Sequence, residues 1–225
     1  QTRISIDHVK IGFFNFNKMD LEGVLIEDQK QDTLLYAGKI QVRITDWFFF
    51  KDKAELKYVG LEDAAVYFNR TDSIWNYNFL KDYFVSTDTS AKKKAGIEFD
   101  LKKVMMKNVT FVKKDEWLGN NMVVKVSGLD MDAREITITN KTVDITNLHL
   151  KDPFFHVYDY AGRKVITTDP DEIRRELNAS QDWKISFGNV TIENGRFKND
   201  KGTLTPATAY FDGKHIDFSS INGSL

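Results

Sequence analysis

The stretch from Gly96 to Asp115, GIEFDLKKVMMKNVTFVKKD, carries a spacing that recurs through the whole chain. Its apolar residues come in pairs whose members are one residue apart, and two residues separate one pair from the next. Alternation within a pair indicates a half-buried β-strand, and the wider step between pairs indicates a kink or bulge. The three pairs are Phe99 with Leu101, Val104 with Met106, and Val109 with Phe111.

Four further stretches share this spacing. They are Phe14, Phe16, Met19, Leu21, Val24 and Ile26; Leu56, Tyr58, Leu61, Asp63, Val66 and Phe68; Val143, Ile145, Leu148, Leu150, Pro153 and Phe155; and Ile185, Phe187, Val190, Ile192, Gly195 and Phe197. The third positions, Met19, Leu61, Val104, Leu148 and Val190, are 42, 43, 44 and 42 residues apart. The residue before the fifth position is small or turn-forming in each copy, namely Gly23, Ala65, Asn108, Asp152 and Asn194. Five copies in register predict a single β-repeat fragment over residues 1–225.

The segments between the copies follow a second pattern. Copies one, three and five lead into strand-rich segments, whereas copies two and four lead into segments with helical spacing. The stretch from Asp72 to Phe84 predicts one short helix, and the stretch from Asp169 to Asn178 predicts another, with Asp169 as N-cap and Pro170 in the first turn. The expected fold is therefore all-β, an elongated and curved antiparallel repeat array with one or two short helices.

The composition excludes several classes of function. The 225 residues include 32 basic and 33 acidic side chains, and this balance leaves no electrostatic footprint for nucleic acid. The chain has no cysteine, which rules out disulfides, thiolate nucleophiles and cysteine-type zinc sites. The longest aromatic run, Trp47 to Phe50, is far shorter than the roughly 20 residues that span a bilayer. Because Gln1 lies almost inside an expected strand, we expect a piece of a longer protein.

Motifs for catalysis or metal binding do not appear in the sequence. His8, His149, His156 and His215 fit no metal-binding spacing, and we expect them at the surface or on pocket walls. The aspartates that follow the sixth position, Asp72, Asp115, Asp159 and Asp200, are interpreted as turn starters rather than calcium ligands. Asp130 and Asp132 alternate on one strand face, which a solvated surface explains. We expect no enzyme activity, no cofactor and no metal.

The apolar positions predict where a ligand could bind. If a bulge at the three-residue step restores one facing, the apolar pairs of successive copies line a continuous trough. The residues of this expected trough are Phe14, Phe16, Met19, Leu21, Phe99, Leu101, Val104, Met106, Ile185, Phe187, Val190 and Ile192. The same residues are equally compatible with two sheets that close over a dry core, and the sequence leaves both arrangements open.

Several phrases resemble one protein family. The stretch Leu21–Leu80, with GIEFDLKKVMMKNVTF and LKDPFFHVYDY, resembles the N-terminal periplasmic part of the Bacteroidetes-type translocation and assembly module subunit TamB and its AsmA-like relatives. The resemblance covers roughly Ile4 to Phe218. It implies a protein of the Gram-negative periplasm, anchored in the inner membrane through a segment outside this chain. It also implies an open apolar groove for phospholipid or other acyl chains, and an outer-membrane assembly partner that binds a C-terminal region outside this chain.

Three hypotheses follow from the sequence. The first is a non-enzymatic envelope-biogenesis bridge or scaffold that transfers phospholipid or assists outer-membrane protein assembly. The second is a purely structural β-repeat spacer or interaction module with a closed core. The third is an enzyme that acts on glycans through Asp130, Asp132 or Glu135.

Overall fold

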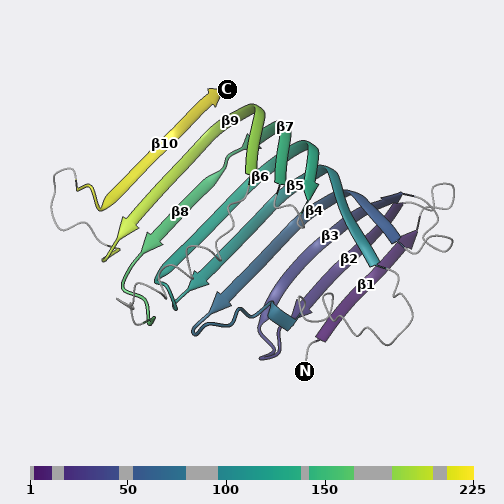
Figure 1. The fold of residues 1–225 in the computed structure, drawn as a ribbon, viewed down its shortest axis with the longest axis horizontal. Helices are drawn as coiled ribbons and strands as arrows, with labels where there is room; N and C mark the ends of the chain where they lie inside the picture. The colour runs from purple at the N-terminus through teal and green to yellow at the C-terminus, as the bar shows by residue number, and fades with distance from the viewer. Residues whose placement is uncertain are drawn as a thin grey trace.

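The computed structural model describes residues 3–11, 18–45, 53–79, 96–137, 142–164, 184–204 and 212–225 (Figure 1). These residues form ten strands in one sheet. The strands are β1 (Arg3–Ile11), β2 (Lys18–Glu27), β3 (Thr33–Thr45), β4 (Lys53–Arg70), β5 (Gly96–Asp115), β6 (Asn120–Thr137), β7 (Thr142–Lys151), β8 (Phe154–Asp159), β9 (Lys184–Lys201) and β10 (His215–Ser224). The expectation of an all-β curved array is confirmed.

The five repeat copies correspond to the strands that run in one direction. These strands are β2, β4, β5, the β7–β8 pair and β9, whereas β1, β3, β6 and β10 run the opposite way. Copies one, three and five are each followed by a return strand, as the strand-rich segments predict. Because copies two and four have no described return strand, β5 pairs with β4 in parallel and β9 pairs with β7 and β8 in parallel. The sheet is therefore mixed, and the expected antiparallel arrangement does not hold at the pairings of β4 with β5, β7 with β9 and β8 with β9.

One residue in the left-handed backbone conformation interrupts each copy shortly before its fifth position. Gly23, Asp63, Asn108, Asp152 and Asn194 have φ angles between 47° and 63°. Glycine, asparagine and aspartate are the residues that adopt this conformation most readily. At Gly23 an added Cβ would lie 1.9 Å from the Asp7 carboxylate, so the Asp7 side chain would have to move to make room for a larger residue. Each interruption absorbs one residue, so the apolar pairs before and after it face the same side of the sheet.

In the second copy, the apolar spacing predicted the wrong position for the left-handed residue. The pairing of β4 with β5 places Val59 beside Val104 and Asp63 beside Asn108. The left-handed residue of this copy is therefore Asp63, and the assignment of Ala65 was wrong by two positions. Apolar residues at both Leu56 and Tyr58 made two frames equally good in the sequence, and only the pairing with the neighbouring strand separates them.

The expected helices are only partly within the described residues. Residues 71–79 turn back after β4, and the helical conformation is limited to Asn78 and Phe79. Residues 71–74 form a bend in which Asp72 accepts the Ile74 N–H at 2.8 Å, and no helix starts at Asp72 as was predicted. Residues 80–84, the predicted helix at Asp169–Asn178 and the aromatic run at Trp47–Phe50 lie outside the described residues.

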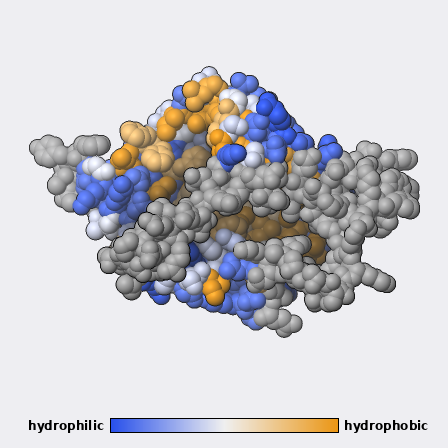
Figure 2. Space-filling model, in the orientation of Figure 1, coloured by the Kyte–Doolittle hydropathy of each residue, from blue (hydrophilic) through white to orange (hydrophobic). Residues whose placement is uncertain are grey.

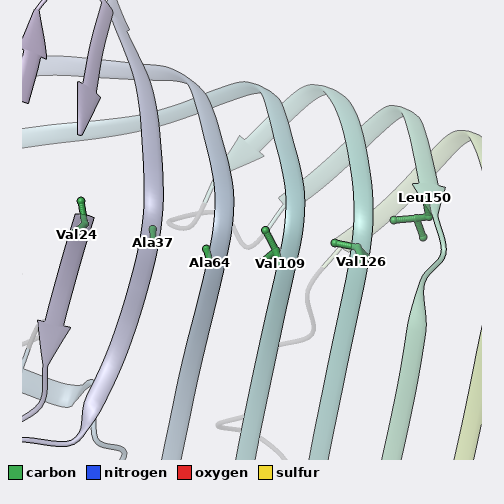
Figure 3. Close-up of a cluster of buried hydrophobic side chains, with 6 residues drawn as sticks. All are labelled: Val24, Ala37, Ala64, Val109, Val126 and Leu150. Atoms are coloured by element: carbon green, nitrogen blue, oxygen red, sulfur yellow. The ribbon is translucent and has the colours of Figure 1, made fainter. Parts of the chain in front are cut away.

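The sheet bends, and its buried side chains lie on the inside of the bend. Figure 1 shows β5, β6, β7 and β9 turning sharply near one end of the array. Figure 3 shows six small or aliphatic side chains side by side on successive strands at this bend, namely Val24, Ala37, Ala64, Val109, Val126 and Leu150. Ala37 is fully buried. Within the described part of the chain no second sheet packs against this face, so the bend itself shelters the core.

Candidate functional site

Four rows of apolar side chains cross the inner face of the sheet, and within a row each residue comes from a different strand. We name each row by the repeat position that it contains, and in the second copy the third to sixth positions are now Val59, Leu61, Ala64 and Val66, as the pairing with β5 requires. The third-position row is Met19, Val42, Val59, Val104, Met131, Leu148 and Val190. The fourth-position row is Val9, Leu21, Ile40, Leu61, Met106, Leu129, Leu150 and Ile192. The fifth-position row is Ile6, Val24, Ala37, Ala64, Val109 and Val126.

The sixth-position row is the longest of the four. It consists of Ile4, Ile26, Leu35, Val66, Phe111, Val124, Phe155, Phe197 and Phe218. Because neighbouring strands are about 4.8 Å apart, nine strands carry this row over roughly 38 Å. The rows belong to one surface, since the buried cluster of the fifth-position row packs against members of the other three. Figure 2 shows apolar side chains set back in the hollow of the molecule.

Burial along the inner face decreases from its centre toward the two edge strands. Val109 and Val126 at the centre are buried, whereas Ile4 on β1 and Phe218 on β10 are each 58% exposed. A contiguous apolar surface that remains accessible marks a binding site more often than a single exposed side chain does. The inner face is therefore the candidate site, and we call it the apolar inner face.

The structure brings together half of the residues predicted to line a trough. Met19, Leu21, Val104, Met106, Val190 and Ile192 all lie in the third- and fourth-position rows. Leu101 lies on β5 and is half-buried, and the backbone of Phe99 pairs with Leu56. Ile185 and Phe187 lie on β9 but are 57% and 54% exposed, outside the sheltered bend. Phe14 and Phe16 lie outside the described residues.

The prediction missed the contribution of the return strands. Ile40 and Val42 on β3, and Leu129 and Met131 on β6, supply the same rows as the repeat copies. The sequence did hold the signal, because the return strands show the repeat spacing in reverse order. The two reversed sets are Leu35, Ala37, Ile40 and Val42, and Val124, Val126, Leu129 and Met131.

At the ends of β4 and β5 the inner face becomes polar. The Arg70 guanidinium donates two hydrogen bonds of 2.7 Å to the Asp115 carboxylate, whose side chain is only 2% exposed. Burial alone would raise the pKa of Asp115, but the hydrogen bonds from Arg70 and from the Leu118 N–H outweigh it and hold the pKa below its usual value. This buried ion pair ends the apolar surface on these strands.

The outer face carries the carboxylates that were considered for catalysis. Asp130 and Asp132 share a face, as predicted, and the Lys103 ammonium lies 2.9 Å and 3.0 Å from their oxygens. The pair is 43% exposed and lies on the opposite side of β6 from Met131. Two carboxylates on one open strand, bridged by a lysine, do not face each other across a substrate cleft.

The histidines divide into two kinds. His149 is exposed and pairs with Glu193, as expected for a surface residue. His215 is only 6% exposed and contacts the buried Asp200 carboxylate at 2.9 Å, so of the two expected positions, at the surface or on a pocket wall, the structure does not place it at the surface. His156 and Lys198 contact the same carboxylate at 2.6 Å and 3.1 Å.

Asp200 thus joins three strands on the outer face. Burial raises its pKa, and the hydrogen bonds from His215, Lys198 and His156 outweigh burial, so the net pKa lies below the usual value. Among the described residues, no group of three or more histidine, aspartate or glutamate side chains has an arrangement that could hold a metal ion. We assign the cluster a structural role at the β8–β10 junction.

Two of the four repeated aspartates act as the turn starters that were predicted. Asp72 accepts the Ile74 N–H, and Asp115 accepts the Leu118 N–H at 3.0 Å. Asp159 instead accepts a hydrogen bond from the Asn120 amide across to β6, and Asp200 holds the histidine cluster. These two aspartates also follow the sixth position of their repeat copies, but their carboxylates contact side chains of neighbouring strands instead of starting a turn.

Comparisons with known proteins do not identify a family. The sequence matches no protein-family model and no curated protein. Among the described residues, no helix is long and apolar enough to cross a membrane.

Proposed function

We propose that this protein is a non-enzymatic component of envelope biogenesis that holds the acyl chains of phospholipid on its apolar inner face. The observation that carries the proposal is the continuity of the four rows, in which every strand from β2 to β6 contributes an apolar residue. Burial of an acyl chain is worth about 0.8 kcal/mol per CH₂ group. A surface of this kind needs no specific polar contact to retain a lipid.

The dimensions of the inner face suit this ligand. A single acyl chain spans half of the bilayer hydrocarbon core, which is about 15 Å. The sixth-position row extends roughly 38 Å at the usual strand spacing, so two acyl chains fit end to end along it. The rows run across the strands, which gives a lipid a uniform apolar path from one edge of the sheet toward the other.

The cellular setting is part of the same proposal and rests on the sequence resemblance. The chain would lie in the periplasm of a Gram-negative bacterium as part of a protein anchored in the inner membrane. A region outside this chain would contact an outer-membrane assembly partner. In this setting the inner face would serve phospholipid transfer, outer-membrane protein assembly, or both.

The test uses two adjacent methionines on opposite faces of β5. Met106 is half-buried in the fourth-position row, whereas Met105 is 42% exposed on the outer face. Burying an amide without a hydrogen bond costs roughly 1–3 kcal/mol. We therefore expect Met106→Gln to weaken binding of a pyrene-labelled phosphatidylethanolamine by about tenfold, as measured by fluorescence titration.

Met105→Gln is the matched control and is expected to bind the probe like the parent. Circular dichroism of both variants checks that the sheet is retained. If the parent binds no lipid probe, or if both substitutions have the same effect, the lipid proposal fails and a structural spacer becomes the better interpretation. A photocrosslinker at position 106, but not at position 105, should label lipid in the same way.

A further inference from the structure

Lys113 lies among apolar residues of the inner face, next to the sixth-position row. The following inner-face row is Phe68, Lys113, Met122, Val157, Asn199 and Ile216. Lys113 stands two residues after Phe111 on β5, so strand alternation places both side chains on the inner face. Its neighbours in the row, Phe68 and Met122, are apolar. A cation therefore lies at the boundary of a surface that is otherwise suited to hydrocarbon.

The positive charge of Lys113 is not neutralised by an ion pair among the described residues. The Lys113 ammonium donates a hydrogen bond of 2.6 Å to the amide oxygen of Asn120, which is uncharged. The nearby carboxylate of Asp115 is already held by both arms of the Arg70 guanidinium. The Asn120 amide in turn donates a hydrogen bond to the Asp159 carboxylate, so Lys113 is linked to this anion only through an uncharged side chain.

Aromatic side chains surround the same boundary. The Phe68 ring lies edge-on to Phe111, with centroids 5.2 Å apart, and 4.6 Å from the ring of Tyr77. The Trp75 ring stacks on the Tyr77 ring. The Arg70 guanidinium lies over the Trp75 ring, 4.5 Å from its centroid. Tryptophan and tyrosine are enriched where hydrocarbon meets water in membranes, because one part of each ring is apolar and one part is polar.

Along β4 and β5, toward their C-terminal ends, the inner face changes from apolar to aromatic to charged, which is the order of environments from the centre of a bilayer to its surface. The apolar rows correspond to the hydrocarbon, Trp75 and Tyr77 to the interface, and Lys113 with the Arg70–Asp115 pair to the head-group layer. Lysine attracts phosphate as a point charge, and lysine side chains are attracted to anionic lipid surfaces.

We propose that Lys113 binds the phosphate of an anionic phospholipid whose acyl chains lie on the fifth- and sixth-position rows. This inference rests on the proposed lipid-binding function and adds to it a preferred ligand and an orientation. The head group lies at the C-terminal ends of β4 and β5, and the acyl chains extend from there into the bend.

The experiment compares two lipids with identical acyl chains, phosphatidylglycerol and phosphatidylcholine, in the parent chain and in Lys113→Gln. We expect the parent to bind phosphatidylglycerol about tenfold more tightly, because Lys113 repels the choline cation of phosphatidylcholine. We expect Lys113→Gln to lose this preference by weakening phosphatidylglycerol binding more than phosphatidylcholine binding. Lys114→Gln is the matched control, because Lys114 is the adjacent, exposed lysine on the outer face. Lys113→Arg keeps the charge and should keep most of the preference.

The outcomes separate this inference from the function on which it rests. Loss of the preference in Lys113→Gln alone, and its weakening in the parent at high salt, support the proposed orientation. An unchanged preference in Lys113→Gln overturns it, and the lipid-binding proposal still stands if Met106→Gln weakens both lipids. Displacement of phosphatidylglycerol by glycerol phosphate without acyl chains would reveal a simple anion site and would also overturn the orientation. A parent chain that binds neither lipid overturns both proposals.

Discussion

On the inner face, neighbouring strands contact one another through aliphatic rows, whereas on the outer face the same strands meet through charged pairs. The register that places Leu61 beside Met106 inside also places Glu62 beside Lys107 outside, where they form an ion pair. The outer charges are largely solvated, while the inner pair Arg70–Asp115 is buried. The sheet therefore has one apolar face and one charged face, and we expect the same substitution to have different effects on the two faces.

The largest expected difference concerns the two ion pairs. Arg70→Ala leaves the Asp115 carboxylate buried without its partner, which typically costs roughly 3–5 kcal/mol of unfolding free energy. Lys107→Ala removes an exposed pair and should cost no more than about 1 kcal/mol. Urea unfolding followed by circular dichroism measures both values. Equal costs would show that the inner pair is as well solvated as the outer one.

A smaller effect is expected at the left-handed residues of the bend. Asn108 has a φ of 52°, and its side-chain amide donates a hydrogen bond of 2.9 Å to Asp63. Asn108→Gly and Asn108→Val both remove this hydrogen bond, but only valine strains the backbone. We expect the valine variant to unfold about 1–2 kcal/mol more easily than the glycine variant in urea. If the two variants are equally stable, the left-handed conformation is not what maintains the bend.

The smallest expected effect is the dependence of stability on acid. Because the pKa of Asp115 is lower in the folded chain than in the unfolded chain, its stabilising contribution is complete above the unfolded value of about 4. The contribution is lost as the pH falls through the lower folded pKa. Asp115→Asn should therefore lose less stability than the parent between pH 5 and roughly pH 2. Parallel curves of unfolding free energy against pH would contradict this assignment.

The repeat spacing predicted the strands and their kinks because each depends on residues close together in the sequence. Asn108, for example, lies between two apolar pairs of β5, and its tolerance of the left-handed conformation is a property of its own side chain. The parallel pairing of β4 with β5 could not be predicted in the same way. It depends on where the chain goes between Arg70 and Gly96, and apolar spacing does not record the direction of a connection.

The candidate site was predictable in part for the same reason. Met106 and Ile192 were identified because they belong to repeat copies, and Leu129 was missed because its strand runs in reverse. The Asp200 cluster illustrates what local sequence cannot provide. His156 lies 44 residues from Asp200 and His215 lies 15 residues from it, and only the pairing of three strands brings them together.

The constant sequence offset between paired residues of β7 and β9 means that the apolar inner face is extended in repeated units. Residues 42 apart are paired from Thr142 with Lys184 through Lys151 with Glu193, and like side chains meet where Asn147 contacts Asn189. A duplicated unit would therefore find every hydrogen-bonding and packing position already matched by its predecessor. Each added pair of strands would lengthen the apolar path by about 10 Å without altering its cross-section. Duplication of a repeat unit in the gene would thus lengthen such a protein, and the residues of the existing apolar inner face would not have to change.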